Sequence, residues 1–236
     1  MDFPRPLIPG TLLRRYKRFL ADVRLDSGGE STIHCPNPGR MLGCAQPGMR
    51  VLISESPNAS RKLKHTLELV HNGACWIGVN PSFANAVAEE GIRAGVVPEL
   101  AGYSGLAREV RHGETTRFDF LLTRGQEKCF VEVKSVTLVG PDGMSAFPDA
   151  VTVRGVKHIR ELLAAKAEGD RAVLLFVVQR PDGLLGFRAA GEIDPLYAET
   201  LRAARTKGLE VYAHWAETGP NGITLTDVRL PIGSGS

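Results

Sequence analysis

Short apolar runs separated by turn sequences fill the first 80 residues, and this pattern restricts that part of the chain to a small all-β fold. The turns are rich in Gly, Pro and Asn, as in Asn37-Pro38-Gly39 and Asn72-Gly73, and these residues suit the backbone angles of tight turns. The runs between the turns cover residues 11–25, 31–35, 49–55, 63–71 and 75–79. Five short strands at this spacing predict a small β-barrel, for which the five-stranded OB fold is the obvious candidate.

The periodicity changes near residue 80, where helix-length patterns begin to alternate with strand-length patterns. Asn80 is suited to cap a helix with Pro81 at its first position. We therefore expect an α/β domain over residues 81–232, in the order α-β-β-β-α-β with a trailing α-β, after a barrel domain over residues 1–80. The Gly and Ser residues at 233–236 resemble a linker. After the first helix, the expected strands cover 106–111, 116–123, 128–136, 172–179 and 209–215, and the expected helices cover 153–168 and 194–208.

Charge is distributed unevenly between the two expected domains. Residues 1–80 hold 11 Lys and Arg against 6 Asp and Glu, whereas residues 81–236 hold 18 against 20. A basic first third suits a module that binds a polyanion, beside a domain with its own acidic site. No apolar run approaches the roughly 18 residues that a membrane span needs, and no signal-peptide core is present at the N-terminus. We expect a cytoplasmic protein with no membrane partner.

One expected hairpin brings acidic and basic side chains to the same face. Gly125-Gln126 fits a two-residue turn, so residues equally distant from it pair across the hairpin. Asp119 then lies opposite Glu132, with β-carbons about 5 Å apart, and Lys134 shares their face. The other face has four apolar residues that would pack on a helix, namely Phe118, Phe120, Val131 and Val133.

These acidic residues suggest a metal-dependent catalytic site. Two opposed carboxylates repel each other, and oxygen ligands favour Mg²⁺ or Mn²⁺, so Asp119 and Glu132 are the expected metal ligands, with Glu109 as a third. Such an ion polarises a phosphodiester and activates water, while Lys134 orients or deprotonates that water or stabilises the transition state. The alternative is a solvated hairpin with a Glu132–Lys134 pair, because the Asp…Glu-x-Lys pattern is short and common.

Basic residues in both domains are candidates for contact with nucleic acid. In the barrel they would contact phosphates while Tyr16 and Phe19 stack on bases. On the helix at 153–168, where His158 lies at the edge of the polar face, they would clamp a scissile strand. The same residues also fit solvated faces of strands and a helix. The candidates are Arg14, Arg15, Lys17, Arg18, Arg40, Arg61, Lys62, Arg154, Lys157 and His158.

Several blocks of sequence point to a known family. They are His34-Cys35-Pro36-Asn37-Pro38-Gly39-Arg40-Met41, Arg117-Phe118-Asp119-Phe120, Val131-Glu132-Val133-Lys134-Ser135-Val136, Phe147-Pro148-Asp149-Ala150-Val151-Thr152, Arg154-Gly155-x-Lys157-His158 and Phe176-Val177-Val178-Gln179. Through them the chain resembles the sugar fermentation stimulation protein family (SfsA) over nearly its whole length. The resemblance implies an OB-fold N-terminal domain, a second domain similar to PD-(D/E)xK restriction-type nucleases, and non-specific DNA binding. It also implies a regulatory role in sugar metabolism, notably that of maltose.

Three hypotheses of function follow. The first is a Mg²⁺- or Mn²⁺-dependent phosphodiesterase acting on DNA, with Asp119, Glu132 and Lys134 as its catalytic residues. The second is a catalytically silent, non-specific DNA-binding regulator of sugar (maltose) metabolism genes. The third is a small-molecule or nucleotide sensor with its pocket at residues 37–40. RNA and branched substrates stay open, and the sequence predicts no oligomeric state.

Overall fold

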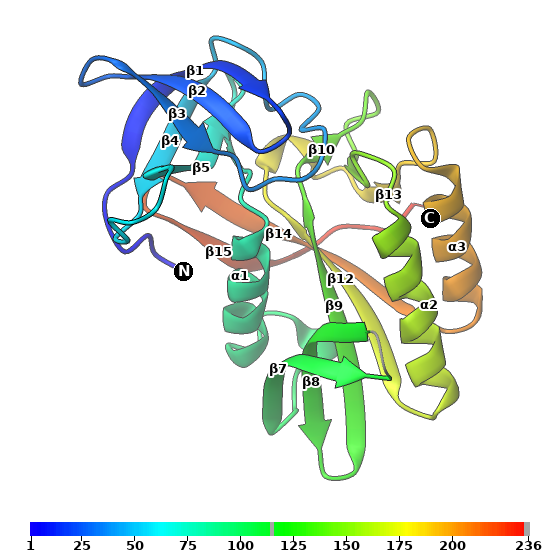
Figure 1. Cartoon of the computed structure of the whole chain (residues 1–236). Helices are drawn as coiled ribbons and strands as arrows, with labels where there is room; N and C mark the ends of the chain where they lie inside the picture. The colour runs from blue at the N-terminus through cyan, green and yellow to red at the C-terminus, as the bar shows by residue number, and fades with distance from the viewer. Residues whose placement is uncertain (114–115, 234–236) are drawn as a thin grey trace.

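A computed structural model describes residues 1–113 and 116–233 of the chain. It consists of an N-terminal β-barrel and a larger unit in which helices cover a mixed β-sheet (Figure 1). The last three residues of the linker-like segment at 233–236 lie outside the described residues. Within the described residues, no helix is both long and apolar enough to cross a membrane.

The N-terminal unit is a closed five-stranded barrel, which confirms the expected OB fold. Its strands are ordered β3-β2-β1-β4-β5, and β6 extends the sheet beyond β5. A parallel bridge between His34 and Thr66 joins β3 to β5 and closes the barrel. Inside, Leu12, Ile33 and Leu67 are fully buried. The strands are β1 (Ile8–Tyr16), β2 (Leu20–Leu25), β3 (Glu30–His34), β4 (Arg50–Glu55), β5 (His65–His71) and β6 (Trp76–Gly78).

The barrel strands differ from the predicted ones in one respect that affects the basic residues. The expected run at 11–25 is two strands, because the chain turns at Lys17 and Arg18, whose φ angles are +47° and +66°. Left-handed backbone at two long side chains has no signature in the sequence, since Gly, Asn and Asp are the usual residues there. Arg14 and Arg15 therefore lie on β1 as expected, whereas Lys17 and Arg18 form the β1–β2 turn at one end of the barrel.

The second unit is built on a six-stranded sheet ordered β15-β14-β12-β9-β8-β7. Helix α1 packs on one face, and α2 and α3 pack on the other (Figure 1). Strands β9, β12 and β14 are parallel, and β7, β8 and β15 run antiparallel to their neighbours. The elements are α1 (Ser82–Arg93), β7 (Gly105–His112), β8 (Thr116–Arg124), β9 (Glu127–Val136), α2 (Val153–Ala167), β12 (Arg171–Val178), α3 (Pro195–Thr206), β14 (Glu210–Gly219) and β15 (Gly222–Arg229).

A polar side chain holds the first turn of each of the three helices. Asn80, the expected cap of the first helix, lies one residue before the observed N-cap, Pro81. Asn80 accepts a hydrogen bond from the Ser82 amide at 3.1 Å, Thr152 accepts one from Gly155 at 3.0 Å, and Asp194 accepts one from Tyr197 at 3.0 Å. These side chains satisfy amides that lack partners in the first turn of a helix. The predicted order α-β-β-β-α-β with a trailing α-β is therefore observed.

The prediction missed four strands of the second unit. One is β15, whose residues alternate but are largely exposed and polar. The other three form a separate small sheet and are too short to leave a periodic pattern, namely β10 (Leu138–Val139), β11 (Ser145–Phe147) and β13 (Phe187–Ala189). Single 3-10 turns cover Pro98–Leu100 and Pro181–Gly183.

Close packing of α1 on β15 gives a test of this arrangement. A β-carbon at Gly91 would lie 2.5 Å from Cδ2 and 3.0 Å from Cβ of Leu225. Ala normally stabilises a helix by about 1 kcal/mol relative to Gly, but here the clash reverses the sign. We expect Gly91→Ala to lower the free energy of unfolding by about 1–3 kcal/mol, as measured by urea denaturation. The double variant Gly91→Ala/Leu225→Ala should lose less free energy of unfolding than the sum of the losses in the two single variants. A Gly91→Ala protein that is more stable than the unaltered one would contradict the packing.

Candidate active site

A cleft of about 350 Å³ lies between the barrel and the second unit. The barrel contributes Arg18 and the loop at 37–39, and the second unit contributes the start of α1, the β8–β9 hairpin and the loop that leads into α2. The polar side chains that line it are Arg18, Asn37, Asn85, Asp119, Glu132, Lys134, Ser135, Thr137, Asp149, Thr152 and Arg154.

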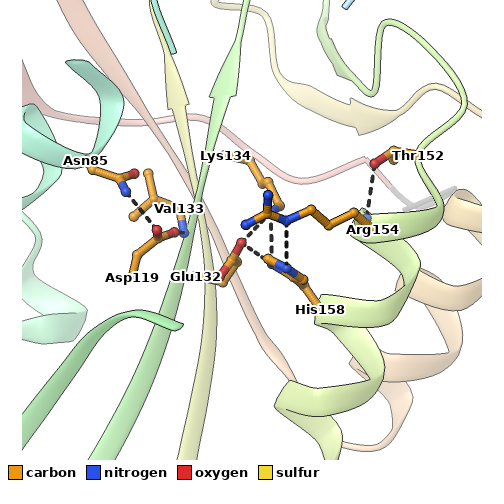
Figure 2. Close-up of polar contacts among 9 residues, drawn as sticks. Asn85, Asp119, Glu132, Val133, Lys134, Thr152, Arg154 and His158 are labelled. Carbon is orange, nitrogen blue, oxygen red and sulfur yellow. Dashed lines mark hydrogen bonds and ion pairs between the residues drawn. The ribbon is translucent and has the colours of Figure 1, made fainter. Parts of the chain in front are cut away.

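The hairpin forms in the expected register, with Arg124 opposite Glu127 and Phe120 opposite Val131. The ladder stops there, so Asp119 and Glu132 are not a paired cross-strand couple as predicted. Instead, the Asp119 carboxylate accepts a hydrogen bond from the Val133 amide at 2.7 Å (Figure 2). A side chain thus replaces the backbone pairing where β8 separates from β9.

The separation of the strands also corrects the expected apolar face. Phe118 packs with Phe130 in the core beneath α2, whereas Phe120 packs with Val131 and Val133 in the core beneath α1. The four residues expected on one face are therefore divided between the two sides of the sheet. A strict two-residue alternation does not hold through Asp119, because the strand is irregular at that point.

Asp119 is a partly buried carboxylate with a raised pKa. The Asn85 amide on α1 donates to its second oxygen at 2.7 Å (Figure 2). Burial disfavours the charged form most, and the nearby Glu132 carboxylate raises the pKa further. Both effects would be relieved by a bound cation.

Glu132 is buried, with a side chain only 4% exposed, and its charge is balanced by two neighbours. Lys134 donates to Oε1 at 2.5 Å, and His158 on α2 contacts the same oxygen (Figure 2). Burial alone would raise the pKa of Glu132, but hydrogen bonds and charge from His158 and Lys134 outweigh it and lower the pKa. The other oxygen, Oε2, is buried and has no hydrogen-bond partner among the described residues.

Arg154 fixes the His158 ring from the opposite side. Its Nε donates to His158 Nε2 at 3.2 Å. Because Nε2 of His158 accepts this bond, the ring proton of the neutral imidazole lies on Nδ1, which donates to Glu132. The sequence predicted Arg154 and His158 as DNA clamps and placed His158 at the edge of the helix, whereas the structure buries His158 as the support of Glu132.

Glu109, expected as a third metal ligand, is not brought to this cleft. Its φ of +52° turns β7 locally, its side chain is 58% exposed, and its closest cation is Arg117 at 3.9 Å. Within the described residues, no group of three or more His, Cys, Asp or Glu side chains is arranged to hold a metal ion. Any ion bound by Asp119 and Glu132 would need further ligands from backbone, water or substrate.

The remaining basic candidates are spread over the surface. Arg18 lines the cleft, Lys17 lies beside it in the turn, and Arg40 is exposed at the end of the cleft loop. Lys157 is exposed on α2. The other candidates lie away from the cleft: Arg14 pairs with Asp22, Arg61 contacts His34, and Lys62 is exposed.

Arg15 holds the cleft loop. Its guanidinium donates to the carbonyls of Asn37, Gly39 and Arg18 at 2.9, 2.8 and 2.7 Å. We expect Arg15→Met to lower the free energy of unfolding by about 1–3 kcal/mol, because it removes the donor to the partly buried carbonyls of Asn37 and Gly39. The matched control is Arg14→Met, which removes an exposed guanidinium and should leave the unfolding midpoint unchanged. Equal effects in thermal unfolding would refute the structural role of Arg15.

Two cleft residues had no assigned role at the level of sequence. Nothing in the sequence identifies Asn85 as a site residue, because a single Asn on a helix is common. Asp149 lies in a block that supported the family resemblance, and its carboxylate accepts the Met41 amide at 2.8 Å. A β-carbon at Gly39 would collide with the same carboxylate. Gln179, which follows β12, is fully buried, and its side-chain amide donates at 2.6 Å to Ser135, which lines the cleft.

The raised pKa of Asp119 predicts a pH-dependent gain in stability from its amide variant. An ionised Asp119 opposes folding above its raised pKa, and this effect is absent below the pKa of the unfolded carboxyl. Asp119→Asn should therefore unfold at a higher temperature than the unaltered protein in EDTA at neutral pH. Thermal unfolding at decreasing pH should show the difference shrink as Asp119 becomes protonated. A variant that is less stable at every pH would show that the bond from Val133 outweighs the charge.

A closed OB barrel joined to a mixed α/β sheet, with a carboxylate-lined cleft between them, defines a two-unit protein of the OB plus α/β class. The N-terminal part matches the SfsA N-terminal OB domain over residues 13–79, and the second part matches the sugar fermentation stimulation protein RE domain over residues 82–222. The chain belongs to the sugar fermentation stimulation protein family.

Individual relatives agree with this assignment. The chain is 51% identical over 235 residues to the sugar fermentation stimulation protein homolog of Geobacter sulfurreducens, with 100% of both chains covered. It is 52% identical to the homolog of Teredinibacter turnerae, covering 98% of this chain and 99% of the other. The solved structure of Pyrococcus furiosus SfsA in complex with Ca²⁺ matches with a TM-score of 0.88 at 28% identity, covering 99% of this chain and 98% of that one.

Proposed function

We propose that this protein is a metal-dependent phosphodiesterase that cleaves DNA in the cleft between its two units. The observation on which this rests is the buried Oε2 of Glu132, an acceptor without a partner among the described residues, beside a second carboxylate whose pKa is raised. An unsatisfied buried acceptor is costly unless a ligand completes it. The hairpin with Asp119 and a Glu-x-Lys sequence, flanked by helices, supports a site of the PD-(D/E)xK type.

The residues present suit a hard divalent cation. Asp119 and Glu132 supply anionic oxygens, the ligands that Mg²⁺ and Mn²⁺ prefer, and a cation would lower the repulsion between them. The Pyrococcus relative was solved with Ca²⁺, which is also an oxygen-binding cation. When bound, the ion would supply Lewis-acid activation of the phosphodiester and of water.

The other side chains would orient the substrate and stabilise charge. Lys134 lies within hydrogen-bond distance of Glu132, so its ammonium is positioned to stabilise negative charge that develops on a phosphoryl oxygen. His158 and Arg154 hold Glu132 in place rather than contact the reacting atoms. Arg18 lines the cleft from the barrel side, where it would contact the DNA backbone.

A cleavage assay tests this proposal directly. Labelled single-stranded, double-stranded and flapped DNA, and an RNA strand, are incubated with Mg²⁺, Mn²⁺ or EDTA. Glu132→Gln and Lys134→Met should each reduce cleavage by about 10²-fold or more, since each removes charge at the reacting centre. Leu185→Ala, at an exposed residue outside the cleft, is the control and should cut at the unaltered rate. Metal-dependent cutting that survives Glu132→Gln would disprove the assignment.

The second candidate is a catalytically silent, non-specific DNA-binding regulator of sugar (maltose) metabolism genes. The exposed cations Lys17, Arg40 and Lys62 on the barrel favour it. Binding without cutting on every substrate, with affinity that falls steeply with salt and does not depend on Glu132, would select this candidate. Both candidates place the protein with DNA in the cytoplasm.

A further inference from the structure

A second and larger pocket, of about 920 Å³, lies against the barrel next to the start of α1. Its walls are largely apolar, and the rings of Phe3 and Phe83 meet edge to face with centroids 5.5 Å apart. A concave apolar site of this size is at the upper end of the range for ligand pockets, about 300–1,000 Å³. The apolar lining residues are Phe3, Pro4, Pro6, Leu7, Ile8, Pro36, Pro57, Pro81 and Phe83.

This pocket adjoins the cleft of the candidate active site. Pro81 lines both. On the barrel side, Pro36 lines the pocket and the next residue, Asn37, lines the cleft. On α1, Phe83 lines the pocket and Asn85, which contacts Asp119, lines the cleft. Pro81 therefore forms a wall that the pocket and the cleft share.

The pocket is lined by two cations, Arg5 and Arg61, and by the exposed carboxylate of Glu55, above a polar floor. Arg5 is exposed, and Arg61 lies 3.1 Å from His34 Nδ1. Glu68 is only 4% exposed and accepts bonds from Ser54 at 2.5 Å and Asn80 at 2.7 Å. Cations outside and apolar walls with hydrogen-bonding groups inside match a nucleotide whose phosphate stays at the rim and whose base enters the pocket.

We propose that this pocket holds the base of a nucleotide that flanks the scissile phosphodiester, so that the substrate is single-stranded at the cleft. The inference rests on the proposed function and specifies its substrate class. A base that is stacked and paired in a duplex cannot occupy a side pocket, so it must be unpaired or displaced first. The cleft itself, at about 350 Å³, has a volume that suits about one nucleotide.

An abasic scan tests the proposal without requiring catalysis. Fluorescently labelled single-stranded oligonucleotides, each with one abasic residue at a successive position, are bound to the full-length protein in EDTA. If one base enters the pocket, one or two adjacent positions should weaken binding by about 5- to 150-fold, as expected for loss of a stacked base. In Phe83→Ala, the same positions should no longer matter, because the wall that the base contacts is gone.

Two further variants make the result decisive. Arg61→Met removes charge from the rim without opening the apolar core, and it should weaken every oligonucleotide while it preserves the position dependence. Leu185→Ala removes an exposed apolar side chain elsewhere and should reproduce the unaltered scan. A flat scan, a position dependence that survives Phe83→Ala, or a duplex that binds as tightly as a single strand would overturn the inference.

The two proposals fail in different ways. Metal-dependent cleavage with a flat scan would keep the active site and reject the base pocket. A position-specific loss that depends on Phe83, without cleavage on any substrate, would keep the base pocket and reject the catalytic function.

Discussion

A carboxylate is unfavourable to bury without a partner, and Glu132 is buried where β9, α2 and the cleft meet. Lys134 and His158 together balance one of its oxygens, and Arg154 keeps the His158 ring in the required orientation. This arrangement needs α2 in one rotational setting, which Val156 and Ile159 establish by packing into the core. The capping bond from Thr152 then begins the helix at the mouth of the cleft. Sheet, helix and site are therefore coupled through one buried charge.

The opposite wall of the cleft is irregular backbone, yet it is well anchored. Arg15 binds its carbonyls from the barrel, and Asp149 accepts the Met41 amide from the second unit. Gly39 allows the Asp149 carboxylate to approach more closely than any side chain would permit. Preorganised groups of this kind lose little entropy when a substrate binds. The cleft is consequently a joint product of both units, and neither would form it alone.

Much of this architecture could be predicted from the sequence because it depends on local signals. Gly125-Gln126 predicted the hairpin register, Asn80 lies just before α1, and Asp194 caps α3 where a helix was expected to begin. The errors occur where the backbone departs from regular geometry, which periodicity does not encode. Left-handed backbone at Arg18 divides the first expected strand of the barrel into two. The same conformation at Glu109 directs its side chain, an expected metal ligand, into solvent.

The site itself was predicted in composition but not in arrangement. Strand alternation predicted one shared face for Asp119, Glu132 and Lys134. In the structure the strands separate at the bond from Val133 to Asp119, so that Asp119 contacts Asn85 on α1 while Glu132 contacts His158 on α2. The burial of His158 depends on how α2 packs against the sheet, and helical periodicity alone placed this residue at the helix edge. Asn85 reaches Asp119 from an element 34 positions away in the chain, and no local pattern links such residues.

The barrel closes on the single bridge between His34 and Thr66, and both residues also line the apolar pocket. A seam with so few backbone hydrogen bonds is the part of a β-barrel that opens at the lowest free energy. Opening of this seam would separate β3 from β5, while β5 would stay hydrogen-bonded to β4 and β6. The wall of the pocket thus contains the part of the barrel that opens most easily, so its shape can adjust to an occupant.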